Sequence, residues 1–154
     1  MNALVVYDST FGNTEEIAQA IAEMLEEKGS VRIMRVGKAT ASEVGAADLL
    51  VIGCPTQRQR PSPAMKAFLD SVPRRSWRGL SAAAFDTRYR KPRLLTGAAS
   101  RRIARGLRKA GASLVVPPES FFVVAREGPL DEGEAQRARD WARQILGTFE
   151  ARTG

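Results

Sequence analysis

The sequence contains no histidine and only one cysteine, Cys54. Without histidine, the chain has no Ser-His-Asp triad, no cysteine–histidine pair and no histidine-ligated metal site. A single cysteine excludes a disulfide within the chain and is typical of a reducing cytoplasm, where we expect the protein to act. Cys54 follows an apolar run, so we expect it to be a small packing residue rather than a redox thiol. No apolar run approaches the ~18–20 residues of a membrane span, and residues 1–4 do not indicate a signal peptide.

Acidic residues are outnumbered, with 17 Asp and Glu against 24 Lys and Arg, which gives a net charge of +7 and a pI near 10.3. A basic protein can attract nucleic acid, an acidic protein or an anionic ligand. The arginines are spread along the chain without a basic tail or interleaved aromatics, and this distribution does not favour nucleic-acid binding. The length of 154 residues, with 44% hydrophobic and 27% charged residues, predicts one globular domain over residues 1–154.

Strand-like and helix-like segments alternate along the chain. Apolar runs predict strands at residues 3–7, 31–36, 48–53, 81–85 and 112–116, with a short extra segment at 121–124. Amphipathic patterns predict helices up to residue 25, at 63–71, at 98–110 and at 131–149, with a short one within 40–47. This alternation predicts an α/β fold: a doubly wound five-stranded parallel sheet of order 2-1-3-4-5, with helices on both faces. The loops at 8–14, 54–62 and 86–96 follow strands 1, 3 and 4, so they would converge at the carboxyl edge of the sheet.

The first of these loops has the composition of a phosphate site. Ser9, Thr10 and Thr14 supply hydroxyls, and Gly12 lets the backbone approach a ligand closely. The following helix presents free N–H groups and the positive end of its dipole to the same place. The alternative is an ordinary strand–helix turn whose polar residues only cap the helix, with Asn13 and Glu16 as the capping pair. The loop holds no cation and has neither dinucleotide nor Walker spacing, so neutral donors would bind the anion.

Three segments together resemble the flavodoxin family. The stretch Tyr-Asp-Ser-Thr-Phe-Gly-Asn-Thr-Glu (7–15) is similar to the family's phosphate loop, usually Ser/Thr-x-Thr-Gly-x-Thr. Ile-Gly-Cys-Pro-Thr (52–56) and Pro-Ser-Pro-Ala-Met-Lys-Ala-Phe-Leu (61–69) resemble its second flavin loop and the helix that follows. Ala-Ala-Ala-Phe-Asp-Thr-Arg-Tyr (82–89) resembles a third flavin loop. The resemblance implies a flavodoxin-like fold that binds FMN non-covalently and passes one or two electrons to a redox partner protein.

The resemblance also implies which residues would hold the cofactor. Those expected at the FMN phosphate are Ser9, Thr10, Phe11, Gly12, Asn13 and Thr14. Those expected to flank the isoalloxazine ring are Pro55, Thr56, Gln57 and Arg58 from the second loop and Phe85, Asp86, Thr87, Arg88 and Tyr89 from the third.

The sequence departs from the family pattern at several of these positions. Phe11 stands where the family usually has threonine, although its backbone N–H remains. The second loop has no aromatic residue at 57–60, which leaves Tyr89 as the aromatic that could stack on the ring. Asp86 could accept a hydrogen bond from a ring nitrogen or cap the loop. Trp77 and Trp141 lie outside the three loops and are expected to be core or interface anchors.

The basic charge is the opposite of that of the strongly acidic flavodoxins. If Arg58 and Arg88 face the ring, they would stabilise the reduced, anionic flavin and raise the midpoint potential of the fully reduced couple. The alternative is that both are solvated surface residues. The same charge suggests an acidic redox partner.

Two other functions are open at this point. One is an FMN-dependent oxidoreductase that reduces a quinone or oxidises a porphyrinogen-type substrate, with Arg58, Arg60 and Arg88 at the substrate's carboxylates. The other is a flavodoxin-fold domain that has lost flavin binding, which the missing second-loop aromatic would explain.

Overall fold

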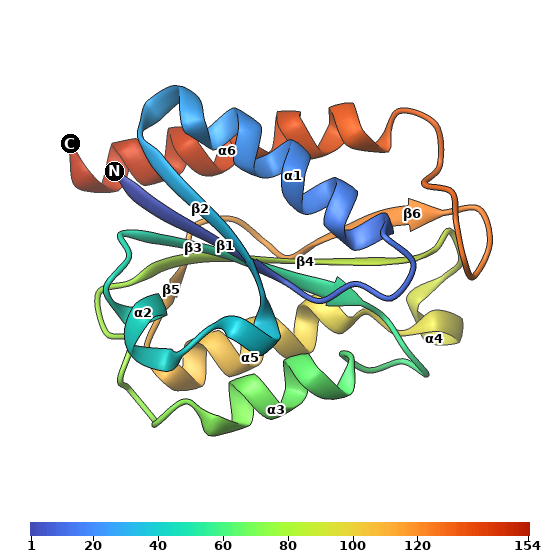
Figure 1. The fold of residues 1–154 in the computed structure, drawn as a ribbon, viewed down its shortest axis with the longest axis horizontal. Coiled ribbons are helices and arrows are strands. Elements are labelled where there is room, and N and C mark those ends of the chain that lie inside the picture. The colour runs from blue at the N-terminus through green and yellow to red at the C-terminus, as the bar shows by residue number, and fades with distance from the viewer.

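The structure, a computed structural model, describes the backbone of residues 1–154 and every side chain except that of Arg93. A central parallel sheet is covered by helices on both faces (Figure 1). Its strands are β1 (Asn2–Tyr7), β2 (Ser30–Arg35), β3 (Leu49–Pro55), β4 (Ser81–Tyr89), β5 (Ser113–Leu114) and β6 (Glu119–Val123). The α-helices are α1 (Asn13–Leu25), α2 (Ala41–Gly45), α3 (Pro63–Ser71), α4 (Arg93–Thr96), α5 (Ala99–Ala110) and α6 (Glu134–Thr153). The 3-10 turns η1 (Glu26–Lys28) and η2 (Val36–Lys38) flank β2.

The sheet has the order β2-β1-β3-β4-β5, and β6 also pairs with β4. All of these pairs are parallel, which confirms the predicted strand order. Two segments share the fifth position: β5 pairs with the start of β4, and β6 pairs with its end, from Phe85 to Tyr89. Pro117 and Pro118 lie between them. Proline has no N–H to donate to a neighbouring strand, so this pair interrupts the edge.

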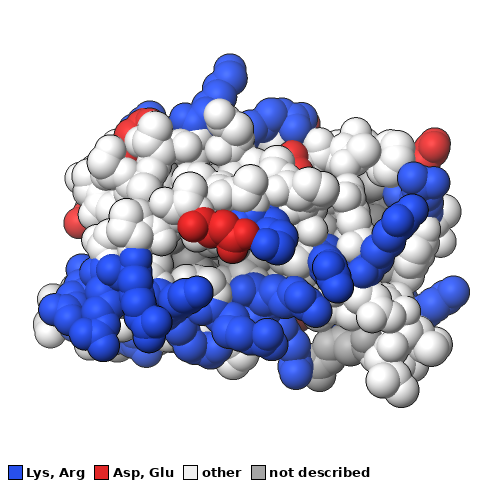
Figure 2. Space-filling model, turned by 90° about the horizontal axis from the view of Figure 1, so that it is seen from below, with Lys and Arg blue, Asp and Glu red and all other residues white. Residues whose placement is uncertain are grey.

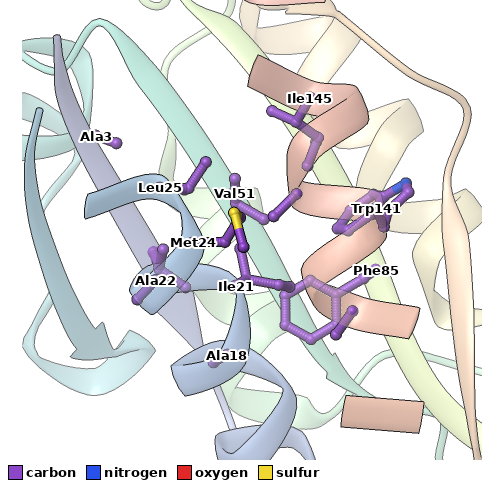
Figure 3. Packing of buried hydrophobic residues seen from close by; sticks show 14 of the residues in the cluster. Ala3, Ala18, Ile21, Ala22, Met24, Leu25, Val51, Phe85, Trp141 and Ile145 are labelled. Carbon is purple, nitrogen blue, oxygen red and sulfur yellow. The ribbon is translucent and has the colours of Figure 1, made fainter. Parts of the chain in front are cut away.

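The central strands bury both faces because their side chains alternate between two apolar clusters. In β1, Val5 and Tyr7 belong to the cluster beneath α1 and α6, whereas Leu4 and Val6 belong to the cluster above α2, α3 and α5. Figure 3 shows the first cluster, in which Phe85 of β4 packs near Trp141 of α6. The continuous apolar runs of the sequence are therefore strands covered on both sides, as predicted.

Helix ends follow their capping residues. Ser62 caps α3 by accepting from the Met65 N–H at 3.4 Å, and Pro63 occupies the first helical position, as expected. The last helix begins at Glu134 rather than at residue 131, because Gly133 adopts a left-handed conformation (φ 81°) immediately before it.

Cys54 and both tryptophans lie in the core. Burial raises the pKa of the Cys54 thiol to about 12, which keeps it protonated and confirms the expected packing role. The indole N–H of Trp77 donates to the carbonyl of Ala41 at 2.9 Å and so fastens α2 to the segment before β4.

No helix among those described is long and apolar enough to cross a bilayer.

Candidate functional site

The loops that follow β1, β3 and β4 meet at the carboxyl edge of the sheet. Parallel strands bring these loops to one side, as the arrowheads in Figure 1 show. The Gln57 amide donates to the Thr10 hydroxyl at 3.3 Å, which joins the first loop to the second. The Gln59 amide donates to the carbonyl of Leu95 at 3.4 Å, which joins the second to the third. The predicted convergence thus takes the form of direct contacts.

Ser9 organises the first loop from inside. Its hydroxyl oxygen accepts from the backbone N–H of Gly12 at 3.1 Å and, more weakly, from that of Glu15 at 3.4 Å. Gly12 has a φ of 93°, which favours glycine, and the position a Cβ would take there is open space. Gly12 is also the N-cap residue of α1, and no side chain caps the helix from that position. Ser9 therefore stabilises this turn, in place of the Asn13–Glu16 pair that the capping alternative would use.

Several backbone donors remain available in this loop. Within residues 9–14, all of which the structure describes, only the N–H of Gly12 has an acceptor, which leaves those of Ser9, Thr10, Phe11, Asn13 and Thr14 free. Unpaired N–H groups at the start of a helix, next to the positive end of its dipole, form a site for an anion. The loop itself contains no carboxylate between positions 9 and 14. The donors present therefore fit a phosphate group.

A cation that the sequence analysis missed also lies beside the loop. Arg35, at the end of β2, is directly opposite Tyr7 in the sheet register. Its guanidinium donates to the carbonyl of Ser9 at 3.0 Å and lies 3.7 Å from the Glu15 carboxylate. The phosphate loop itself contains no Lys or Arg, as expected. The neighbouring strand β2 nevertheless places the positive charge of Arg35 beside the loop. The parallel register of strands 1 and 2 was the signal that could have identified it.

The other two phosphate-loop residues connect the loop to distant segments. The hydroxyls of Thr14 and Thr87 are hydrogen-bonded at 2.8 Å in a buried position, which ties the start of α1 to β4. The Asn13 amide donates to the carbonyl of Glu127 at 3.2 Å. The exposed ring of Phe11 lies at the surface of the loop.

The second loop is a tight turn. Gln57 and Arg60 exchange two backbone hydrogen bonds, of 2.8 and 2.9 Å, around Arg58 and Gln59. Both of these central residues have positive φ values, 48° and 68°. Thr56 anchors the base of the turn, since its N–H donates to the Thr87 carbonyl and its hydroxyl accepts from the N–H of Ala99 at 3.0 Å.

The third segment differs from the prediction, because β4 continues to Tyr89 instead of ending at residue 85. Phe85 is fully buried and packs edge-on against Phe121 and Trp141, so its side chain does not fit the expected place beside a ring. Asp86 is also fully buried, and its carboxylate accepts from the N–H of Ser100 at 2.8 Å.

The position of Asp86 fits the capping alternative rather than a contact with a ring nitrogen. Burial raises the pKa of its carboxyl, and the hydrogen bonds from Ser100 and Ser120 partly offset that effect. Thr87 is buried against Thr14, and Tyr89 is the partly exposed aromatic at the end of the strand.

Arg88 serves the loop that follows β4. Its Nε donates to the Ser120 hydroxyl at 3.0 Å, and one terminal nitrogen donates to the Lys91 carbonyl at 2.7 Å and the Thr96 hydroxyl at 3.1 Å. The guanidinium also lies 5.1 Å from the centre of the Phe122 ring. These contacts hold residues 89–96 in place. They do not fit the expectation that Arg88 turns its charge toward a ring, nor the alternative that it is a solvated surface residue.

The chain is similar in sequence to a known protein family. The sequence model of the family described as Flavodoxin matches residues 5–141. The chain belongs to the flavodoxin family. The cofactor of this family is FMN, whose single phosphate suits the donors around Gly12. A flavodoxin of Aquifex aeolicus is 41% identical over 71 residues; this match covers 45% of the chain and 38% of that relative's length.

Solved flavodoxin structures share the fold. The oxidised Flavodoxin 2 of Bacillus cereus superposes with a TM-score of 0.81 at 22% identity, over 96% of this chain and 99% of that one. A flavodoxin from the domain Archaea superposes with a TM-score of 0.79 at 23% identity, over 97% and 99% of the two chains. Both comparisons agree with the doubly wound sheet described above.

Proposed function

We propose that this flavodoxin holds FMN at the carboxyl edge of its sheet and works as an electron carrier. The observation that carries the proposal is the set of free N–H donors around Gly12, placed where three loops join. When bound, FMN supplies chemistry of one or two electrons, and the chain binds and orients it and sets its electrostatic surroundings.

The phosphate end is prepared by the protein's own hydrogen bonds. Ser9 fixes the backbone of Gly12 and Glu15, so the remaining N–H groups need no rearrangement to receive an anion. Arg35 lies beside the loop and adds positive potential, part of which Glu15 neutralises. The proposed phosphate ligands remain residues 9–14.

The ring end is proposed to lie between the turn at 57–60 and the end of β4. Of the nine residues expected there, the proposal keeps Pro55, Thr56, Gln57, Arg58 and, from β4, Thr87 and Tyr89. The exposed ring of Tyr89, with the Lys91 ammonium 5.8 Å from its centre, supports a stacking role. Backbone groups of the 57–60 turn replace the aromatic that the second loop lacks.

We further propose that its redox partner carries an acidic docking surface and that both act in the cytoplasm. Arg58 and Arg60 are exposed on the turn at the rim, and within the described residues neither forms an ion pair with a carboxylate. Complementary charge accelerates the encounter of two proteins, so an acidic surface on the partner would speed its association with this basic chain. The single cysteine, Cys54, is a free and buried thiol, as is typical of proteins in a reducing compartment. This supports a location in the cytoplasm.

The direct test is titration of the protein with FMN, followed by flavin fluorescence, in the wild type and in Gly12→Ala. The added methyl group projects into the open space of the phosphate loop, so we expect affinity to fall at least tenfold, or about 1.4 kcal/mol. Gly79→Ala is the matched control, because Gly79 has a similar φ of 84° and equally open space but precedes β4 at the opposite edge. Absence of flavin binding by the wild type, or equal affinities of the two variants, would refute the proposal.

A further inference from the structure

The cations of this protein are unevenly neutralised. Around α1, α6 and β6, arginines pair with carboxylates, as in Arg139 with Glu23 and Arg137 with Glu134. Along α5 the situation differs. Within the described part of the chain, no carboxylate lies within ion-pair distance of the α5 cations, which are Arg101, Arg102, Arg105, Arg108 and Lys109.

The uncompensated cations gather on one side of the molecule. Figure 2 views the side covered by α3 and α5 and shows Lys and Arg across it, with little acidic surface. Between Arg58 and Lys109 the sequence has only two acidic residues, Asp70 and the buried Asp86. Crowded like charges repel one another, so this face favours an anionic occupant.

Several of these cations line a groove between α3 and α5. It encloses about 450 Å³, which is within the size range of ligand-binding clefts. Its cationic lining consists of Arg60, Lys66, Arg102, Arg105 and Lys109. Its apolar lining includes Leu69, Val72, Gly106 and Ala110. Among the described residues that line it, Asp70 is the one carboxylate, and it is already paired with Lys66. Cations above an apolar floor suit a chain that carries both carboxylates and an apolar side chain.

The groove also leads to the proposed flavin. Arg60 belongs both to the groove lining and to the turn at 57–60, at the rim of the site. From there the groove follows α3 and α5, and its lining on α5 runs from Arg102 to Ala110, about 12 Å of helix. An extended peptide of about four residues has that length. A partner protein bound in this groove would therefore lie next to the proposed flavin site.

We propose that the groove between α3 and α5 is the docking site for an acidic segment of the redox partner, with one apolar side chain of that segment on Leu69 and Val72. The proposal rests on the electron-carrier function and specifies its partner surface. A protein segment is favoured over nucleic acid because the large exposed aromatic side chains, Phe11 and Tyr89, lie elsewhere and leave none to stack on bases. It is favoured over a membrane because the exposed Leu94 and Leu95 belong to α4 and do not line the groove.

The test compares two charge reversals on the same helix. The pair Arg102→Glu and Arg105→Glu changes the groove, whereas Arg101→Glu and Arg108→Glu changes net charge equally outside it. The probe is a fluorescent eight-residue peptide of Asp and Glu with one central Leu, measured by anisotropy at low salt. We expect at least tenfold weaker binding for the groove variant and less than threefold for the control. Replacing the central Leu by Ser should also weaken binding several-fold.

Equal losses in the two double variants, or no effect of the Leu replacement, would overturn the docking site in favour of a diffuse electrostatic surface. Tighter binding of a single-stranded oligonucleotide, or of vesicles of anionic phospholipid, than of the peptide would overturn the choice of occupant. FMN titration of the same variants keeps the two proposals apart. Unchanged flavin affinity with lost peptide binding is expected, and failure of the wild type to bind FMN would refute the carrier function while leaving the groove result interpretable.

Discussion

Two residues of the turn after β3 hold backbone conformations that ordinary side chains resist. Arg58 and Gln59 are both left-handed, at a cost of roughly 1–2 kcal/mol each. Gly97 makes this turn possible from outside, since a Cβ at that position would lie 2.5 Å from the Cα of Gln59. The shape of the proposed ring site therefore depends on a glycine 38 positions further along the chain.

Replacing Gly97 by alanine should displace the turn. We expect Gly97→Ala to lower the free energy of unfolding by about 2 kcal/mol, because the residue has a φ of 70° and the methyl group collides with backbone. Gly79→Ala, with a φ of 84° and open space, should cost only about 1 kcal/mol. Urea denaturation measures both values, and FMN titration should show lost affinity in Gly97→Ala alone. A Gly97→Ala protein as stable as the control would contradict this account.

Among the elements, β4 shows most clearly what sequence patterns reveal. Its first half is an apolar run and was predicted, whereas Asp86, Thr87 and Arg88 looked like the start of a loop. They remain in the strand because this half of β4 pairs with β6, which lies more than thirty residues further along the chain. Their side chains also have distant partners, at Ser100, Thr14 and Ser120 respectively. No local pattern records such pairings.

The same distinction applies to the site. The donors of the phosphate loop follow from local composition, since a glycine and free N–H groups at a helix start are encoded in consecutive residues. The contribution of Arg35 and the redirection of Arg88 are set by neighbouring strands. The short extra segment expected at 121–124 is part of β6, but its pairing with β4 beside β5 is a long-range contact that the local pattern did not predict.

A charged clamp joins β6 to the start of α6. The Glu134 carboxylate is almost fully buried, accepts from the N–H of Phe122 at 2.8 Å and pairs with Arg137. Burial alone would raise the pKa of Glu134, but the hydrogen bonds from Arg137 and Phe122 outweigh it and hold the pKa below its ordinary value. The clamp also positions Arg137 over the Phe121 ring, 4.6 Å from its centre.

Glu134→Gln should therefore destabilise the protein in a pH-dependent way. Because the folded pKa is lowered, the carboxylate stabilises the fold above its ordinary pKa of 4.5, and this stabilisation is lost as the pH falls through that value and the folded pKa below it. We expect a loss of about 2 kcal/mol at pH 7 that shrinks toward pH 3. Urea denaturation across pH measures it, with the exposed Glu132→Gln as control. A loss independent of pH would point to packing instead of charge.

On the scale of the whole molecule, the net charge of +7 acts on any charged ligand at the rim. One charge at about 8 Å contributes on the order of 1 kcal/mol when the effective dielectric constant is near 40. Of the two arginines expected to tune the ring, Arg88 is committed to its own loop, which leaves Arg58. The positive surroundings should favour reduced, anionic FMN.

The expected midpoint potential of the fully reduced couple is consequently less negative than in an acidic flavodoxin. Arg58→Gln should lower that potential by about 20–50 mV, and added salt should reduce the difference. Arg108→Gln, which makes the same charge change on α5, serves as the distant control. Potentiometric titration of the three proteins measures the effect. An equally low potential in the wild type, or equal shifts in the two variants, would show that the charge near the ring has no such role.

Both edges of the sheet are poor templates for another strand. β2 carries Arg32 and Arg35 along its exposed length, and the opposite edge is broken by Pro117 and Pro118 between β5 and β6. Charges and prolines on edge strands oppose the edge-to-edge pairing that leads to fibres. The proline pair that divides the fifth strand therefore also makes that edge a poor template for a second copy of the chain.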